Sequence, residues 1–141
     1  MSRFCIADRA PFGSLLKQPN AKKRKPVKLA RSRDNMHLAA VRRLPCLSCN
    51  RDPGGVAAHV RMSAPGKPNA GVGCKPDDWW ALPLCDNCHT RGPTAQHNVG
   101  EPTFWRRLGI DPLALCAAIY AVSPDVPKMR DAISKATGTQ K

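Results

Sequence analysis

The chain has 141 residues, of which 42% are hydrophobic, and this is enough for one domain with tails. Its formal net charge of +13 favours a nucleic-acid partner, because lysines and arginines bound to phosphates release counterions; a solvated basic surface is the alternative. No signal segment or membrane-length apolar run is visible, and the seven cysteines are an odd number. A secreted disulfide scaffold and a membrane partner are therefore not expected. The expected location is a reducing cytoplasm.

Residues 1–33 are predicted to form a basic, disordered arm. They contain three prolines and the run Lys22-Lys23-Arg24-Lys25, and such a segment buries little apolar surface. The run is a candidate for contact with the DNA backbone, and a solubilising tail is the alternative reading.

The middle of the chain predicts a small α+β domain over residues 34–122. Asp34 is a cap for a helix from about Asn35 to Leu44, which Pro45 ends. Two short strands follow, at 56–60 and 79–84, and between them lies an excursion rich in glycine, proline and lysine.

Helices are predicted for the rest of the chain. One starts near Asp86 and is interrupted at Gly92-Pro93, and another covers Glu101 to Leu108. Asp111-Pro112 then opens a helix that is expected to pack on the core through Leu113, Cys116, Ala117 and Tyr120. Residues 123–141 are assigned to a basic C-terminal helix and tail.

Four cysteines in two pairs give the strongest chemical signal in the chain. The units are Cys46-Leu47-Ser48-Cys49 and Cys85-Asp86-Asn87-Cys88, a spacing typical of a tetrahedral thiolate site for structural zinc. Two disulfides, or four unrelated core cysteines, explain the paired spacing less well. Zinc would contribute folding free energy to a domain of this size.

His59 lies on the first predicted strand, ahead of a glycine-rich loop, a second strand and a helix that opens with His89. That order is the outline of a ββα-metal unit, in which a strand histidine takes a proton from water and helix residues hold a divalent cation. An isolated strand histidine is more often a packing or surface residue, so the interpretation depends on this setting.

Several motifs in one order resemble the phage and prophage HNH nucleases, in particular the group related to the recombination enhancement function nuclease. The resemblance covers about Met36 to Tyr120. The motifs are Leu44-Pro45-Cys46-Leu47-Ser48-Cys49, Ala58-His59-Val60-Arg61, Gly71-Val72-Gly73-Cys74-Lys75-Pro76-Asp77-Asp78, Leu82-Pro83-Leu84-Cys85-Asp86-Asn87-Cys88-His89, Gly100-Glu101, Phe104-Trp105 and Gly109-Ile110-Asp111-Pro112.

The resemblance implies hydrolysis of a DNA phosphodiester. His59 matches the general base, while His89 and His97 match ligands of a catalytic divalent metal, which would be Mg²⁺, Mn²⁺ or Zn²⁺. It also implies that Cys46, Cys49, Cys85 and Cys88 hold structural zinc, that DNA is the partner, and that a recombinase filament is a possible second one.

Two features depart from the family pattern. The family's two helix histidines usually stand four positions apart, whereas eight positions separate His89 from His97 here. Many HNH sites place a ligand just before the base, where this chain has Ala58. Asp78 is a weak candidate for an oxygen ligand or a loop anchor, and a cap or surface pair is the alternative.

Further basic and aromatic residues accompany the motif. Trp79, Trp80 and Trp105 admit a base-stacking role, but core packing is the better interpretation for at least two of them. A non-catalytic, zinc-stabilised DNA-binding protein or recombination adaptor is the second functional hypothesis. The candidates for phosphate contact near the motif are Arg61, Lys75, Arg91, Arg106 and Arg107.

Overall fold

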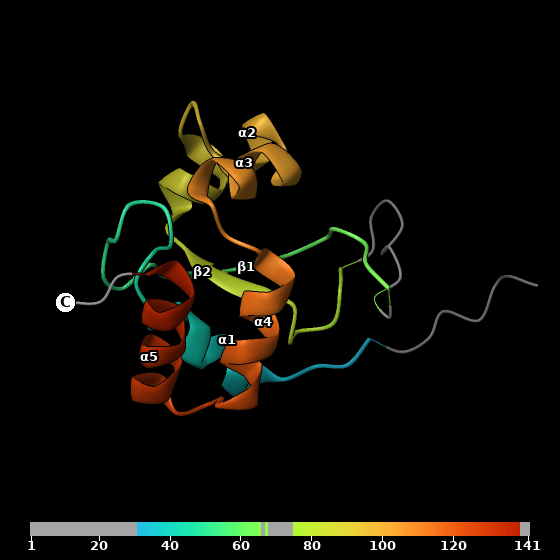
Figure 1. Cartoon of the computed structure of the whole chain (residues 1–141), viewed down its shortest axis with the longest axis vertical. Helices are drawn as coiled ribbons and strands as arrows, with labels where there is room; N and C mark the ends of the chain where they lie inside the picture. The colour runs from blue at the N-terminus through green and yellow to red at the C-terminus, as the bar shows by residue number, and fades with distance from the viewer. Residues whose placement is uncertain (1–30, 66, 68–74, 139–141) are drawn as a thin grey trace, which may run out of the picture.

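The computed structural model describes residues 31–65, 67 and 75–138, and over these residues the protein is a small α+β fold, as expected (Figure 1). Cys5, Cys74 and the basic run at 22–25 lie outside the described residues. The elements are α1 (Asn35–Arg42), β1 (Val56–His59), β2 (Ala81–Leu84), the π-helical turn η1 (Asn87–Arg91), α2 (Gln96–Val99), α3 (Glu101–Leu108), α4 (Pro112–Ala121) and α5 (Val126–Thr137).

Strands β1 and β2 form a two-stranded antiparallel sheet. Val56 pairs with Leu84 and His59 pairs with Ala81, which places His59 at the end of the ladder. The second strand is shorter than predicted, because a turn from Asp77 to Trp80, closed by a 3.1 Å backbone hydrogen bond, takes the two tryptophans out of it. Both strands are edges, so Pro83 is tolerated within β2.

The sheet lies between two groups of helices. In Figure 1, α1, α4 and α5 lie below the two strands, while α2 and α3 lie above them. Helix α1 contacts both strands, α4 contacts β2, and α5 packs on α4; α2 contacts both η1 and α3. The two strands therefore connect the helical groups.

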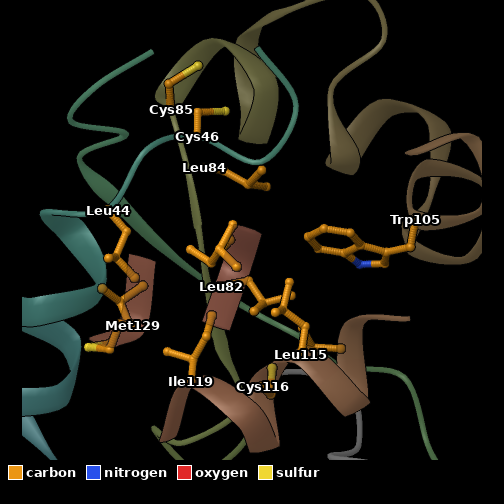
Figure 2. Close-up of a cluster of buried hydrophobic side chains, with 14 of the residues drawn as sticks. Leu44, Cys46, Leu82, Leu84, Cys85, Trp105, Leu115, Cys116, Ile119 and Met129 are labelled. Atoms are coloured by element: carbon orange, nitrogen blue, oxygen red, sulfur yellow. The ribbon is translucent and has the colours of Figure 1, made fainter. Parts of the chain in front are cut away.

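One continuous core joins these layers. Leu82 of β2 lies near Trp105 of α3 and near Leu115 and Ile119 of α4, as Figure 2 shows. Helix α5, which the sequence analysis placed in a separate tail, shares this core through Met129. Trp105 is buried and Trp80 packs on the core, so the packing interpretation is confirmed for these two tryptophans, and Cys116 is a buried core residue, also as expected.

The buried face of α4 differs from the predicted one. Ala117 and Tyr120 are exposed, whereas Leu115 and Ile119 are buried beside Cys116. Because nearly every residue of α4 is apolar, the pattern does not single out one face.

The helix termini follow the sequence closely. The carboxylate of Asp34 accepts from the His37 backbone N–H, and that of Asp111 accepts from the N–H groups of Leu113 and Ala114. Gly109 ends α3 with φ +66 and Gly138 ends α5 with φ +67, a conformation that favours glycine. The predicted caps at Asp34 and Asp111 and the end of α3 at Leu108 are confirmed, whereas α1 ends at Arg42, before the predicted end near Leu44.

Residues 31–33, assigned to the arm in the sequence analysis, contact the folded domain. The Ser32 N–H donates to Asp77 Oδ1 at 2.8 Å, and the Ser32 carbonyl accepts from the Asp78 N–H at 3.2 Å. The folded unit thus includes Arg31 as well as the residues after 33.

Candidate metal centre and histidine site

The four predicted cysteines converge on one point. Cys46 and Cys49 come from the turn after α1, and Cys85 and Cys88 from the junction of β2 with η1. Their Sγ atoms all lie within 4.8 Å of one another, and those of Cys49 and Cys85 are 3.6 Å apart. Two thiolates on one tetrahedral zinc ion, with bonds of about 2.3 Å, are about 3.8 Å apart. The quartet therefore has the geometry and the donor atoms to hold a structural zinc ion.

Backbone contacts fix the first cysteine turn against the sheet. The Leu47 N–H donates to the Pro83 carbonyl at 3.1 Å, and the Gly54 N–H donates to the Leu44 carbonyl at 2.8 Å. A Cβ on Gly54 would lie 3.0 Å from the Leu84 carbonyl oxygen and 3.2 Å from the Cys46 nitrogen. Only glycine lets the turn approach β2 this closely.

The environment of the thiols differs across the quartet. Burial raises the pKa of Cys46 and raises the pKa of Cys88 to about 12. Burial also opposes ionisation of Cys85, but hydrogen bonds from the Cys88 N–H and from neighbouring thiols outweigh it and lower the pKa of Cys85 to about 7. Cys85 is therefore more readily ionised than Cys46 or Cys88, and thiolate is the form that binds a metal.

His89 and His97 lie side by side despite the eight positions between them. Their Nε2 atoms are 3.1 Å apart, and their rings meet edge to face with centroids 4.5 Å apart. Two imidazoles bound to one tetrahedral ion at about 2.05 Å have nitrogens about 3.3 Å apart. A hydrogen bond between neutral rings also explains the short separation, and the pair fits either arrangement.

The Gly92-Pro93 interruption is the turn that brings His97 back to His89. Gly92 ends η1, and its N–H donates to the Asn87 carbonyl at 2.7 Å. The Asn98 side chain then donates to the Gly92 carbonyl at 2.7 Å, which ties α2 to the turn. In the family pattern the two histidines lie on one helix. Here they lie on two short helical segments, η1 and α2, which contact each other.

His89 is favoured in its neutral, metal-binding form. Burial lowers its pKa, and the nearby His97, His59 and Arg61 lower it further against the opposing charge of Asp86. Among the described residues, the cysteine quartet is the only group of three or more cysteine, histidine or acidic ligand atoms within mutual reach. Within this part of the chain, His89 and His97 thus offer two adjacent ligand atoms and no third one within mutual reach.

His59 is held at the end of β1 by a buried carboxylate. Its side chain is 16% exposed, and its Nε2 lies 3.1 Å from Oδ1 of Asp78. Burial lowers the pKa of His59, and the hydrogen bond to Asp78 acts in the opposite direction. His59 is close enough to His89 for its charge to contribute to the lowered pKa of His89.

Sequence reasoning gave no role to Arg31 or Glu101, which support the site. The Arg31 guanidinium contacts Asp78. Glu101, at the start of α3, accepts from the backbone N–H of Arg61 at 2.9 Å and from that of Met62 at 3.2 Å. It therefore ties the chain after His59 to the helix that follows His97. The signal for this role in the sequence was that Glu101 is an acidic residue in the first turn of a predicted helix.

The predicted phosphate-contacting residues fall into two groups. Arg61, Lys75 and Arg106 are exposed. Arg91 pairs with Asp86 at 2.5 Å, and Arg107 donates to the Thr94 carbonyl at 2.9 Å and lies over the Phe104 ring. Among the described residues, Arg91 and Arg107 are therefore held by protein contacts. The side chains of Arg61, Lys75 and Arg106 have no hydrogen bond or ion pair there.

The fold and site together define a small α+β protein with a four-cysteine cluster that can bind zinc and, following Cys88 in the chain, a histidine, His89, that contacts His97. In comparisons with protein-family models, curated proteins and solved structures, nothing matched the chain. Within the described residues, every helix is too short or too polar to cross a membrane.

Proposed function

We propose that the protein is a metal-dependent endonuclease of the HNH type that nicks DNA with low sequence specificity. The observation that carries the proposal is the 3.1 Å separation of Nε2 of His89 and Nε2 of His97. A third imidazole, His59, is near enough for its charge to lower the pKa of His89. The order β1, β2, η1 also matches the order of a ββα-metal unit. A DNA-binding protein without catalysis needs neither a ligand pair nor a neutral imidazole beside it.

Each histidine has a distinct role in this proposal. His59 removes a proton from the attacking water, and its lowered pKa keeps it neutral and able to do so at neutral pH. His89 and His97 hold a divalent ion, which when bound supplies positive charge toward the phosphate and the leaving 3′ oxygen. The zinc-bound cysteines fix β2 against η1, and thereby fix His59 relative to His89.

The charge of the chain supports DNA as the substrate. A net charge of +13 favours phosphate contact, and the exposed Arg61 and Lys75 lie two and sixteen positions after His59 in the chain. The arm run at 22–25 adds sequence-independent contacts to the backbone. These are backbone-binding residues, which accounts for the low specificity.

The resemblance gives the proposed setting. It places the enzyme in phage DNA recombination or processing, in the cytoplasm of a bacterial or phage-infected cell, where a recombinase filament is a candidate partner. None of these follows from the geometry of the histidines.

A plasmid-nicking assay tests the activity. Supercoiled DNA is incubated with the zinc-loaded chain and Mn²⁺ or Mg²⁺, and open-circle product is measured for the native protein, His59→Ala and Lys128→Ala. We expect the native rate for Lys128→Ala, an exposed residue of α5, and a loss of at least roughly 100-fold for His59→Ala. Zinc content and circular dichroism show that each variant is folded.

The outcomes separate the two functional hypotheses. Loss of nicking in a folded, zinc-loaded His59→Ala supports the enzyme. If the native protein binds DNA but gives no open circles with any divalent ion, and so behaves like His59→Ala, the second hypothesis holds. The chain is then the non-catalytic, zinc-stabilised DNA-binding protein.

A further inference from the structure

A buried carboxylate lies behind His59, on the side of its Nε2 atom. Asp78 is 1% exposed, and each of its oxygens has a partner. Oδ1 contacts the Arg31 guanidinium and lies 3.1 Å from His59 Nε2, while Oδ2 accepts from the Asp34 N–H at 2.9 Å. With both oxygens engaged by the protein, Asp78 is placed to orient neighbouring groups. The metal-ligand role considered from the sequence is not supported, because Asp78 belongs to no group of three or more metal-ligand atoms among the described residues.

These contacts determine which nitrogen of His59 carries the proton. Hydrogen bonds from Arg31 and Asp34, against the opposing effect of burial, lower the pKa of Asp78 to about 2, so its carboxylate is ionised and only accepts. A contact of 3.1 Å with Nε2 is then a hydrogen bond only if Nε2 carries a hydrogen.

The alternative is a hydrogen bond from Arg31 to an unprotonated Nε2. The separation of Arg31 Nη2 and His59 Nε2 is 3.5 Å, longer than the 3.1 Å contact with Asp78. In that arrangement two lone pairs, one on Nε2 and one on the carboxylate, would face each other at the shorter distance. The carboxylate contact therefore decides the tautomer, and Arg31 instead neutralises Asp78.

We propose that Asp78 is a positioning residue that holds His59 as the Nε2–H tautomer, so that Nδ1 is the atom that receives the proton from water. The inference rests on the proposed function, because it names the basic atom of the same site. The carboxylate fixes the ring orientation and stabilises the imidazolium that forms when Nδ1 takes up the proton. The water loses that proton as its oxygen attacks phosphorus, and the bond from phosphorus to the leaving 3′ oxygen breaks.

Other charged groups also act on His59. Arg31 and Lys75 disfavour its protonated form, and His37 and His89 are near enough to interact with it. Asp78 is the one acidic group that contacts the ring directly among the described residues. The experiment therefore measures the tautomer of His59 directly, and not the pKa of its ring.

Asp78 also anchors the segment before α1, so a structural role has to be separated from a positioning role. Asp77 provides the matched control, because its Oδ1 accepts from the Ser32 N–H at 2.8 Å and it anchors the same segment. Asp77→Asn removes a carboxylate charge, keeps an acceptor for the Ser32 N–H, and leaves the contact between Asp78 and the His59 ring intact.

The experiment combines nitrogen-15 NMR of the histidine side chains with nicking kinetics. The full, zinc-loaded chain is labelled at histidine, and the His59 resonances are assigned by comparison with His59→Ala. We expect the Nε2–H tautomer in the native protein and in Asp77→Asn. In Asp78→Asn the amide donates to Nε2, so we expect the Nδ1–H tautomer, with kcat reduced roughly 100-fold to 10,000-fold and KM unchanged.

Each outcome decides the inference. A native His59 protonated on Nδ1 overturns it, and this measurement needs no variant to fold. An Asp78→Asn protein with unchanged tautomer and unchanged kcat also overturns it. If the native chain does not nick DNA with Mn²⁺ or Mg²⁺, the proposed function fails, while the tautomer still shows whether Asp78 orients His59.

Discussion

The cysteine quartet and the histidine site are built in opposite ways. The quartet takes two ligands from each of two tight turns, and its sulfur atoms lie within 4.8 Å of one another. The histidines come from three elements, β1, η1 and α2, and depend on supporting contacts from Asp78, Gly92 and Glu101. Short-range spacing therefore sets each half of the first site, whereas no two histidines of the second site share a turn.

Loss of one quartet ligand should have the largest effect. Cys85→Ser removes a thiol whose pKa is lowered to about 7, and leaves three ligands at the junction of β2 with η1. Structural zinc supplies about 10–16 kcal/mol in small zinc domains at pH 7, which is comparable with the whole stability of a typical domain. We expect an unfolded, zinc-free protein by circular dichroism and metal analysis.

Cys116→Ala is the control for that prediction. Cys116 is buried in the core but stands apart from the quartet, so its loss removes packing and not a ligand. We expect full zinc content and a loss of roughly 1 kcal/mol in unfolding free energy. A Cys85→Ser protein that folds as well as Cys116→Ala would show that the quartet does not hold the fold together.

The second prediction separates the two sites by their affinity for metal. Four thiolates bind zinc far more tightly than two imidazoles bind an ion, so brief treatment with a mild chelator should remove metal only from the histidines. We expect nicking to stop while the circular dichroism spectrum and one zinc ion per chain remain. Added Mn²⁺ should restore activity.

His97→Ala sharpens this separation, because it removes one of the two imidazoles, while His97 is exposed and contributes little to the core. We expect the concentration of Mn²⁺ needed for half-maximal nicking to rise at least roughly 10-fold, with zinc content unchanged. An unaltered metal requirement would mean that the 3.1 Å contact with His89 is only a hydrogen bond.

The two sites also differ in how far the sequence predicts them. The two C-x-x-C turns of the quartet, the helix caps at Asp34 and Asp111 and the end of α3 at Leu108 depend on neighbouring residues, and all were predicted correctly. The contact between Asp78 and His59 joins residues 19 positions apart across the loop between the strands, and no periodicity encodes it. The prediction of the buried face of α4 was wrong for a related reason. A helix that is apolar on all sides is oriented only by the elements that pack on it.

Glu101 gives a prediction of intermediate size. Glu101→Ala removes the acceptor for the N–H groups of Arg61 and Met62, and with it the link between the end of β1 and α3. We expect a loss of about 1–3 kcal/mol in the free energy of unfolding, measured by urea denaturation, and slower nicking from misplaced histidines. Glu101→Gln keeps an acceptor oxygen and should lose less of both; equal losses would show that the contact itself is unimportant.

The smallest effect concerns pH and the buried His37, which lies outside both sites. His37 is 1% exposed, its Nδ1 lies 2.8 Å from the Ser123 hydroxyl, and burial lowers its pKa despite the opposing charges of Asp34 and Asp78. Below about pH 6.5 the unfolded chain therefore binds a proton that the folded one resists, and stability falls as pH decreases toward the folded pKa. One such group contributes at most about 1.4 kcal/mol per pH unit to the slope of the unfolding free energy against pH.

We therefore expect His37→Gln to show a shallower loss of unfolding free energy between pH 6.5 and 5.5 than the native protein, and a parallel curve above pH 7. His59 and His89 also have lowered pKa values and contribute slope to both proteins, so the difference between the two curves isolates His37. Urea denaturation of zinc-loaded protein at each pH measures it. Identical slopes would mean that His37 is protonated as readily in the folded protein as in the unfolded chain, which its burial against Tyr120 argues against.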